Sequence, residues 1–256
     1  MDALLVERGL AESRGRAQGL ILSGSVRVGD RVVTKAGSRV SPDAHLAVER
    51  RDGFASRAGE KLDSALDEFE VSVRGRSCLD AGASTGGFTD VLLRRGAREV
   101  LAVDVGYGQL DWALRSDPRV VVMERTNVRH LTGEKLPCRP DLLVADLSFI
   151  SLTVALEGLI STTPSIREAV VLVKPQFEAG PELVGRGGVV RDPEVHAALI
   201  LCVARYFAAL GFGAVGVTRA PVAGRRAGNR EYPLHLVRGA KPGLDEERVR
   251  KVVGCG

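Results

Sequence analysis

The chain has 256 residues, of which 45% are hydrophobic and 27% are charged. This length allows one large domain, or a small domain beside a large one, and the composition excludes a chain that is disordered throughout. No stretch approaches the roughly 18 apolar residues that a membrane span requires. The first ten residues carry acids early and lack a basic start followed by an apolar run, so we expect neither a secretory signal nor a membrane partner.

The cysteines and histidines exclude several kinds of site. The four cysteines are scattered without a CxxC pair, and the four histidines lie far apart in the sequence. These patterns predict neither a metal site nor a disulfide framework, and they fit a reducing cytoplasm. The net charge is +4, and 30 of the 36 basic residues are arginines. Arginine suits phosphate recognition, although a genome-wide preference for arginine would give the same count.

Residues 1–49 have the pattern of a small α+β domain. Apolar residues at 4–6 and 17–22 predict two short helices. Two three-residue runs, 26–28 and 31–33, flank a Gly-Asp pair that is typical of a tight hairpin, and a further short strand is expected at 45–48. A polar, glycine-containing stretch follows, so we expect residues 50–58 to form a linker.

The small domain is basic. Between residues 8 and 39 it has seven basic residues against two acidic ones. A basic face on a helix–helix–hairpin unit is the pattern expected of a nucleic-acid-binding surface, and a solvated surface is the alternative. A second basic stretch, residues 219–241, has six bases against one acid. The side chains that we expect to contact nucleic acid are Arg8, Arg14, Arg16, Arg27, Lys35, Arg225 and Arg226.

Residues 59–256 alternate apolar runs with helical patterns. This alternation predicts an α/β domain with a doubly wound, mostly parallel, Rossmann-like sheet. The loop between the last two strands is too short for a helix, so that pair is expected to be antiparallel. The expected strands are 77–81, 100–104, 120–123, 142–146, 170–174, 214–218 and 232–237, and the expected helices are 59–69, 88–95 and 152–160, with a further short one within 244–253.

A glycine-rich loop follows the first strand of this domain and precedes a helix. Its glycines allow close approach of a ligand, and Asp104, 22 residues after Gly82, can accept hydrogen bonds from a ribose. The loop reads GxxxGG instead of the dinucleotide pattern GxGxxG, and Asp80 would repel a pyrophosphate. We therefore expect S-adenosylmethionine as the cofactor, with a dinucleotide site or a purely structural turn as alternatives. The expected cofactor contacts from this pattern are Asp80, Gly82, Ala83, Ser84, Thr85, Gly86, Gly87, Phe88, Asp104, Asn127 and Asp146.

A lysine and an aspartate follow two other strands at the same edge. Lys174 comes after four apolar residues, and Asp146 ends the preceding strand pattern. Burial lowers the pKa of a lysine, and a lysine with a lowered pKa can act as a general base near neutral pH. An ordinary buried ion pair at the strand ends is the alternative.

Five motifs together resemble the TlyA family of ribosomal RNA 2′-O-ribose methyltransferases, which is also labelled hemolysin A. They lie at residues 57–62, 79–89, 104–110, 146–151 and 173–178. The catalytic domain of that family is similar to the FtsJ methyltransferases, and residues 1–49 resemble a small RNA-binding fold named after a ribosomal small-subunit protein. The resemblance covers nearly the whole chain.

The resemblance implies a catalytic tetrad of Lys61, Asp146, Lys174 and Glu231, and an adenine-side role for Phe149. In this mechanism Lys174 accepts or directs the proton of a ribose 2′-hydroxyl, and Asp146 orients Lys174. The implied substrate is a cytidine of large-subunit ribosomal RNA, as free RNA or in a ribosomal subunit, and longer family members also modify the small subunit. DNA lacks the 2′-hydroxyl and is not an expected substrate, and we expect a monomer.

Two other classes of function are weighed against this one. A membrane-lytic protein would agree with the hemolysin label, but the sequence has no spanning segment and no long amphipathic repeat. An RNA-binding factor with an inactive methyltransferase domain would agree with the basic stretches, but all four tetrad positions and the cofactor loop are intact.

Overall fold

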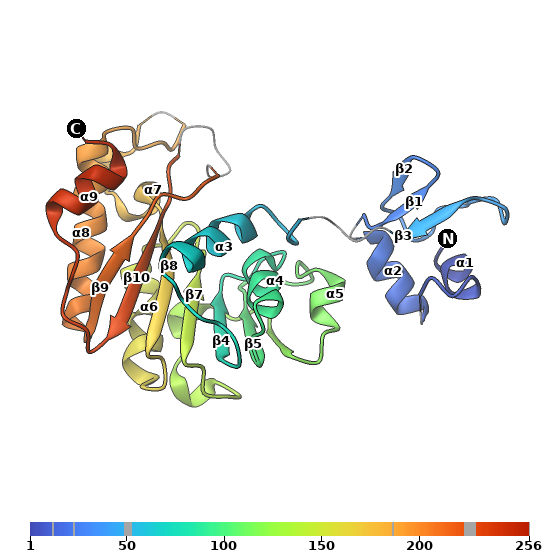
Figure 1. The fold of residues 1–256 in the computed structure, drawn as a ribbon, viewed down its shortest axis with the longest axis horizontal. Helices are drawn as coiled ribbons and strands as arrows, with labels where there is room; N and C mark the ends of the chain where they lie inside the picture. The colour runs from blue at the N-terminus through green and yellow to red at the C-terminus, as the bar shows by residue number, and fades with distance from the viewer. Residues whose placement is uncertain (12, 23, 49–52, 186, 223–228, 256) are drawn as a thin grey trace.

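The computed structural model describes residues 1–11, 13–22, 24–48, 53–185, 187–222 and 229–255. The elements of residues 1–48 gather at one end of the molecule, and the large sheet with its helices forms the other end (Figure 1). The predicted boundaries of the linker stay a prediction, because residues 49–52 lie outside the described residues.

The N-terminal unit has two helices, α1 (Asp2–Glu7) and α2 (Arg14–Leu22), and a small antiparallel sheet. Its strands are β1 (Val26–Val28), β2 (Arg31–Val33) and β3 (Leu46–Val48), with β1 in the centre. The predicted helix–helix–hairpin order is confirmed. The unit has its own core, whose buried residues are Leu5, Ala11, Ala17, Ile21, Val26 and Leu46.

The large sheet has seven strands in the order β6-β5-β4-β7-β8-β10-β9. Strands β4 to β8 pair in parallel, and β10 pairs antiparallel with both β8 and β9, as predicted for the last two strands. The strands are β4 (Ser77–Ala81), β5 (Glu99–Val103), β6 (Val120–Met123), β7 (Leu142–Ala145), β8 (Glu168–Val173), β9 (Phe212–Val217) and β10 (Tyr232–Arg238).

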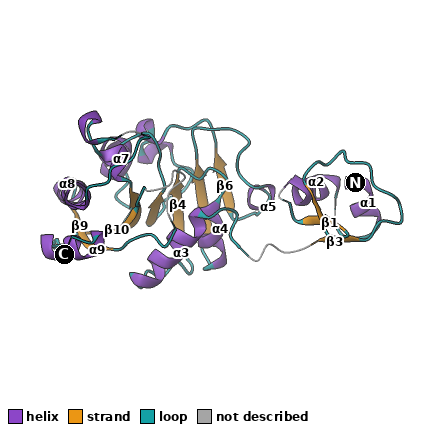
Figure 2. Ribbon diagram, turned by 90° about the horizontal axis from the view of Figure 1, so that it is seen from above, coloured by secondary structure: helices purple, strands orange, loops and turns teal. Residues whose placement is uncertain are grey.

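Helices cover both faces of this sheet, which confirms the doubly wound class. Figure 2 shows α3 and α4 on one face and α7 on the other. One core cluster joins the sheet to α6, α8 and α9, and a second joins it to α3, α4 and α5. The helices are α3 (Ala58–Glu68), α4 (Gly87–Arg94), α5 (Trp112–Arg115), α6 (Leu152–Thr162), α7 (Pro175–Glu178), α8 (Pro193–Ala209) and α9 (Glu246–Val253), with short 3-10 turns at Val128–His130, Gly133–Lys135 and Pro181–Leu183.

The structure corrects the sequence prediction in two respects. The 17-residue helix α8 was not predicted, although Asp192 caps it, Pro193 opens it and Ile200 and Phe207 lie at helical spacing on its buried side. Three parallel strands end one residue earlier than predicted, so Asp104, Asp146 and Lys174 lie just beyond the sheet. Sheet pairing ends there because the chain turns toward the next helix, and the three side chains are free to converge at the edge.

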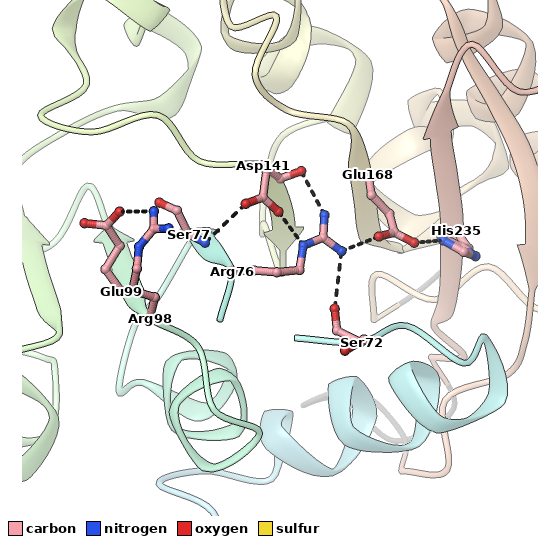
Figure 3. A network of polar contacts seen from close by, with 8 residues as sticks. All are labelled: Ser72, Arg76, Ser77, Arg98, Glu99, Asp141, Glu168 and His235. Carbon is pink, nitrogen blue, oxygen red and sulfur yellow. Dashed lines mark hydrogen bonds and ion pairs between the residues drawn. The ribbon is translucent and has the colours of Figure 1, made fainter. Parts of the chain in front are cut away.

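The opposite, amino-terminal edge of the sheet is held by a charged network around Arg76 (Figure 3). The Arg76 guanidinium pairs with Asp141 and Glu168, which precede or begin β7 and β8, and it donates to the Asp141 carbonyl oxygen at 3.1 Å. Glu168 also binds His235 Nε2 of β10 at 2.7 Å. Burial alone would raise the pKa of Glu168, but the hydrogen bonds from His235 and Arg76 lower it below 4.5. The interactions of ionised Glu168 therefore stabilise the fold at pH values above 4.5. This stabilisation is lost as the pH falls through the lowered pKa of Glu168.

We expect Arg76→Ala to reduce the free energy of unfolding by about 2–4 kcal/mol at pH 7, because it leaves two partly buried carboxylates without their cation. Arg98→Ala is the matched control, since Arg98 is largely exposed and pairs with Glu99 at the surface. Its cost should be within about 0.5 kcal/mol. Urea unfolding followed by circular dichroism measures both, and equal losses would contradict the structural role of Arg76.

The N-terminal unit touches the large domain through Trp112, the single tryptophan of the chain. Gly15 and Gly19, one turn apart on α2, face the indole. A Cβ atom on Gly19 would lie 1.9 Å from Trp112 Cδ1, and one on Gly15 would lie 3.7 Å from Trp112 Cζ2. Only glycine at position 19 therefore allows α2 to approach α5 this closely.

Replacement of Gly19 by leucine should displace the indole and shift the fluorescence emission of Trp112 to the red, because the ring becomes more exposed to water. Gly37→Leu, in an open position of the same unit, should leave the emission unchanged. An unaltered spectrum in the Gly19 variant would show that α2 does not pack on Trp112 in solution.

Candidate active site

Three carboxylates meet at the carboxyl-terminal edge of the large sheet. Asp80 lies near the end of strand β4, and Asp104 and Asp146 follow its neighbours β5 and β7. The structure therefore brings the three predicted acidic residues to adjacent strand ends. In open α/β sheets this edge is where ligands bind.

Asp80 is fully buried and only half satisfied. Its Oδ2 accepts a hydrogen bond from Thr89 Oγ1 at 2.7 Å, whereas its Oδ1 has no hydrogen-bond partner among the described residues. Burial raises the pKa of Asp80, the hydrogen bonds from Thr89 lower it, and the nearby charges of Asp146 and Asp104 raise it, so that it lies at about 7. A buried carboxylate oxygen without a donor indicates a position where a cationic or hydrogen-bond-donating ligand is favoured.

Asp104 accepts two backbone hydrogen bonds, one from the glycine-rich loop and one from the segment that follows β5. The Ser84 N–H donates to Asp104 Oδ2 and the Gly106 N–H donates to Oδ1, both at 2.7 Å. Gly82 and Gly86 have φ values of 87° and 95°, and a Cβ atom on Gly82 would lie 2.8 Å from the Asp146 carbonyl oxygen. The turn itself therefore requires these glycines, and they are not by themselves evidence for a ligand.

Lys174 and Asp146 form a buried ion pair. Lys174 is 6% exposed, and its Nζ lies 2.5 Å from Asp146 Oδ1. Lys174 Nζ also donates to Ser148 Oγ at 3.1 Å and lies 5.8 Å from the centre of the Phe177 ring. Sequence reasoning predicted the lysine and the aspartate but missed Ser148, which lies two residues beyond Asp146 in the same loop.

Lys61 and Glu231 form a second buried pair. They are 170 residues apart in the sequence, on α3 and just before β10, and are 8% and 4% exposed. Tyr232 pairs with Val173, so the next residues outward, Glu231 and Lys174, lie at the same edge of the sheet. All four residues of the predicted tetrad thus lie at the carboxyl edge as two lysine–carboxylate pairs. Lys61 entered the prediction through the resemblance of residues 57–62 to the TlyA family, and the structure shows that it lies on the buried side of α3.

The surroundings of the other predicted cofactor residues do not by themselves indicate a cofactor contact. Phe149 is 87% exposed, and its ring centre lies 5.1 Å from that of Phe177, near Lys174. Asn127 is exposed, and its Oδ1 accepts from the Arg129 N–H. Phe88 is buried in the core between the sheet and α4. Their roles toward a cofactor stay predictions. Of the remaining predicted residues, Ala83 and Thr85 lie in the loop between β4 and α4, and Gly87 is the first residue of α4.

The predicted nucleic-acid contacts are described only in part. Arg8 is exposed and donates to the Ala44 and Pro42 carbonyl oxygens, and Arg14 pairs with Asp2 at 3.4 Å. Lys35 is exposed and Arg27 is partly buried in β1. Arg16 lies on α2. Arg225 and Arg226 lie outside the described residues, so this part of the prediction stays open.

Comparison with known proteins identifies the family. The FtsJ-like methyltransferase family matches residues 54–238, and the S4 domain family matches residues 2–46. The protein named 16S/23S rRNA (cytidine-2′-O)-methyltransferase TlyA from Mycobacterium tuberculosis is 52% identical over 238 residues, which cover 92% of this chain and 88% of that protein. This chain belongs to the TlyA family of FtsJ-like methyltransferases.

Two further relatives of this TlyA-family chain carry the hemolysin label. Hemolysin A of Brachyspira hyodysenteriae is 38% identical over 93% of this chain and 99% of that protein. A solved structure from Streptococcus thermophilus, described as a hemolysin, is 36% identical over 99% of this chain and 94% of its own, with a TM-score of 0.75. In the part of this chain that the structure describes, no helix is long and apolar enough to cross a membrane.

The donor set fits an S-adenosyl cofactor better than a phosphate-bearing one. Three carboxylates and the unpaired Asp80 oxygen favour a sulfonium and an ammonium group, and they disfavour a pyrophosphate. Among the described residues, no cluster of three or more histidine, cysteine or acidic side chains could hold a metal ion.

We expect Asp80→Asn to stabilise the ligand-free protein at pH 8. The folded-state pKa of Asp80 is raised to about 7 from 3.8, so ionisation costs stability as the pH rises from about 4 to 7. The asparagine should gain roughly 2–4 kcal/mol at pH 8 and much less at pH 4. Thermal unfolding across this pH range tests it, and an equal difference at both pH values would contradict the buried-charge explanation.

Proposed function

We propose that this protein transfers the methyl group of S-adenosylmethionine to the ribose 2′-hydroxyl of a cytidine in ribosomal RNA. The observation that carries the proposal is the pair of buried ion pairs, Lys174–Asp146 and Lys61–Glu231, at the carboxyl edge of a methyltransferase sheet. The name of the 52% identical relative supports the substrate.

The acidic edge is the proposed cofactor site. Asp80 would hold the ammonium group, and the loop backbone would hold the amino-acid tail. Asp104 would accept hydrogen bonds from the ribose hydroxyls, which would replace or join those that it accepts from the Ser84 and Gly106 N–H groups. Asn127 and Phe149 are proposed on the adenine side. When bound, the cofactor supplies a methyl group that its sulfonium already activates.

The two lysine–carboxylate pairs are the proposed catalytic machinery. Lys174 is held from two sides, by Asp146 and by Ser148, and this fixes the direction of its amine. In that position the Lys174 ammonium can donate a hydrogen bond that directs the 2′-hydroxyl toward the methyl group, and it can receive the hydroxyl proton only as it passes one of its own protons to Asp146. The charges of Lys61 and Glu231 compensate each other. The second pair therefore fills part of the carboxyl edge of the sheet without adding net charge. Positioning of the hydroxyl should supply most of the rate, since the donor is already activated.

The N-terminal unit is the proposed RNA-binding domain. Its match to the S4 domain family and its basic side chains support contacts with phosphates, so affinity should fall with salt. The relative's name includes both 16S and 23S RNA, and we propose targets in both subunits instead of the large subunit alone. We place the enzyme in the cytoplasm as a monomer acting on ribosomal RNA or on assembled subunits.

Tritiated methyl transfer to purified ribosomal subunits, followed by mapping of the modified ribose, tests the function. Incorporation at a cytidine of either subunit, with none into DNA, is the expected result. Lysis of red cells without methyl transfer would favour the hemolysin alternative. Binding of ribosomal RNA without transfer would favour an inactive scaffold.

Replacement of Lys174 by methionine should lower kcat by at least about 100-fold and leave the Kd for S-adenosylmethionine within about threefold, because the lysine acts on the hydroxyl and not on the cofactor. Lys135→Met, which removes an exposed lysine of a 3-10 turn, is the control and should retain full activity. Near wild-type turnover of the Lys174 variant, measured on ribosomal subunits, would rule out this role.

A further inference from the structure

The loop that carries the catalytic aspartate is strained. Phe149 has a φ of 65°, an unfavourable region for a bulky side chain. Strain of this kind persists only where the surrounding structure holds the backbone in place. The loop runs from Asp146 to the start of α6 at Leu152, so contacts at its two ends must hold it. At the first end, Asp146 and Ser148 are bound by Lys174.

Glu178 holds the other end. Its carboxylate accepts the Leu152 N–H at 2.9 Å and the Ser151 Oγ–H at 2.6 Å. Leu152 is the first residue of α6, and its N–H has no partner within the helix. Ser151 is the N-cap residue, and its Oγ also accepts from the Thr153 N–H at 3.2 Å. The carboxylate also lies at the positive end of the helix dipole. Glu178 therefore caps α6 from α7, a separate element that begins directly after Lys174.

The two segments are joined along their whole length. Lys174 contacts Asp146 and Ser148, the Phe177 ring packs at a tilt against Phe149, and Glu178 binds the α6 terminus. Contacts at the first residue of one segment and at its fifth fix both the separation and the direction of the other. A shift at the Glu178 end would rotate the loop about the Lys174 end.

We infer that Glu178 is a positioning residue of the methyl transfer, which locks the strained loop 146–151 against the segment that carries Lys174. This inference rests on the proposed function of the Lys174–Asp146 pair. Both Glu178 oxygens are engaged by α6, so Glu178 acts through the loop and not on the substrate.

Three variants test this role. Glu178→Ala removes both hydrogen bonds. Glu178→Gln keeps them, since its carbonyl oxygen can accept from Leu152 and its amide can donate to Ser151 Oγ. Glu182→Ala removes an exposed carboxylate of the following 3-10 turn and is the control. For each, kcat, KM and the Kd for S-adenosylmethionine are measured on ribosomal subunits, and amide hydrogen exchange is measured for the peptide covering 147–153.

We expect Glu178→Ala to lower kcat roughly 10- to 100-fold and to speed hydrogen exchange in that peptide. The cofactor Kd should rise by a smaller factor, because Phe149 of the same loop is proposed on the adenine side. Glu178→Gln should restore most of both properties, and Glu182→Ala should match the wild type. Unchanged exchange and kcat in Glu178→Ala would overturn the inference. An inactive Glu178→Gln with wild-type exchange would also overturn it, because the charge and not the cap would then matter.

The exchange measurement separates this inference from the proposed function. If the wild type transfers no methyl group to ribosomal RNA, the proposed function fails, whereas faster exchange in Glu178→Ala alone would still show that Glu178 locks the loop. If the wild type is active and Glu178→Ala is equally active, only the positioning role fails.

Discussion

The site depends on the compensation of two buried lysines. A lysine removed from water is stable only beside a carboxylate, and loss of either partner leaves an uncompensated charge. Among the described residues, Lys174 and Lys61 each pair with one carboxylate. The four residues come from the position after β8, the loop after β7, α3 and the segment before β10. The pairs can therefore form only when the sheet has its full strand order.

The antiparallel strand β10 is central to that order. It lies next to β8, so its first residues reach the same edge as Lys174. At the opposite edge, the Arg76–Glu168 ion pair and the hydrogen bond between Glu168 and His235 join β8 and β10 to the start of β4 (Figure 3). The two edges differ in a way that suits their roles. The amino-terminal edge holds the hydrogen-bonded network of Arg76, whereas the carboxyl edge holds a strained Phe149 and an Asp80 oxygen without a partner among the described residues.

The sequence pattern of the glycine-rich loop indicated a ligand, whereas the structure explains the glycines by the backbone conformation of the turn. Its glycines are required by left-handed backbone and by contacts with the Asp146 backbone and Leu114. The three converging carboxylates are the better evidence for a cationic nucleoside cofactor, and their convergence is visible only in the folded chain. Phe88, expected at the cofactor, is buried in the core, and its role toward a cofactor stays a prediction.

The sequence by itself determined the fold class, the order of the strands along the chain, the antiparallel last pair, and Asp146 and Lys174 as candidates, because apolar periodicity and strand-end positions are local signals. Helix α8 also has a local signal, an Asp-Pro start before an apolar helical pattern, although the prediction from sequence did not include this helix. Only the tertiary structure placed Lys61 against Glu231, and Glu178 against the start of α6. Those contacts join segments that are up to 170 residues apart, and they depend on strand order and burial, which no local pattern records.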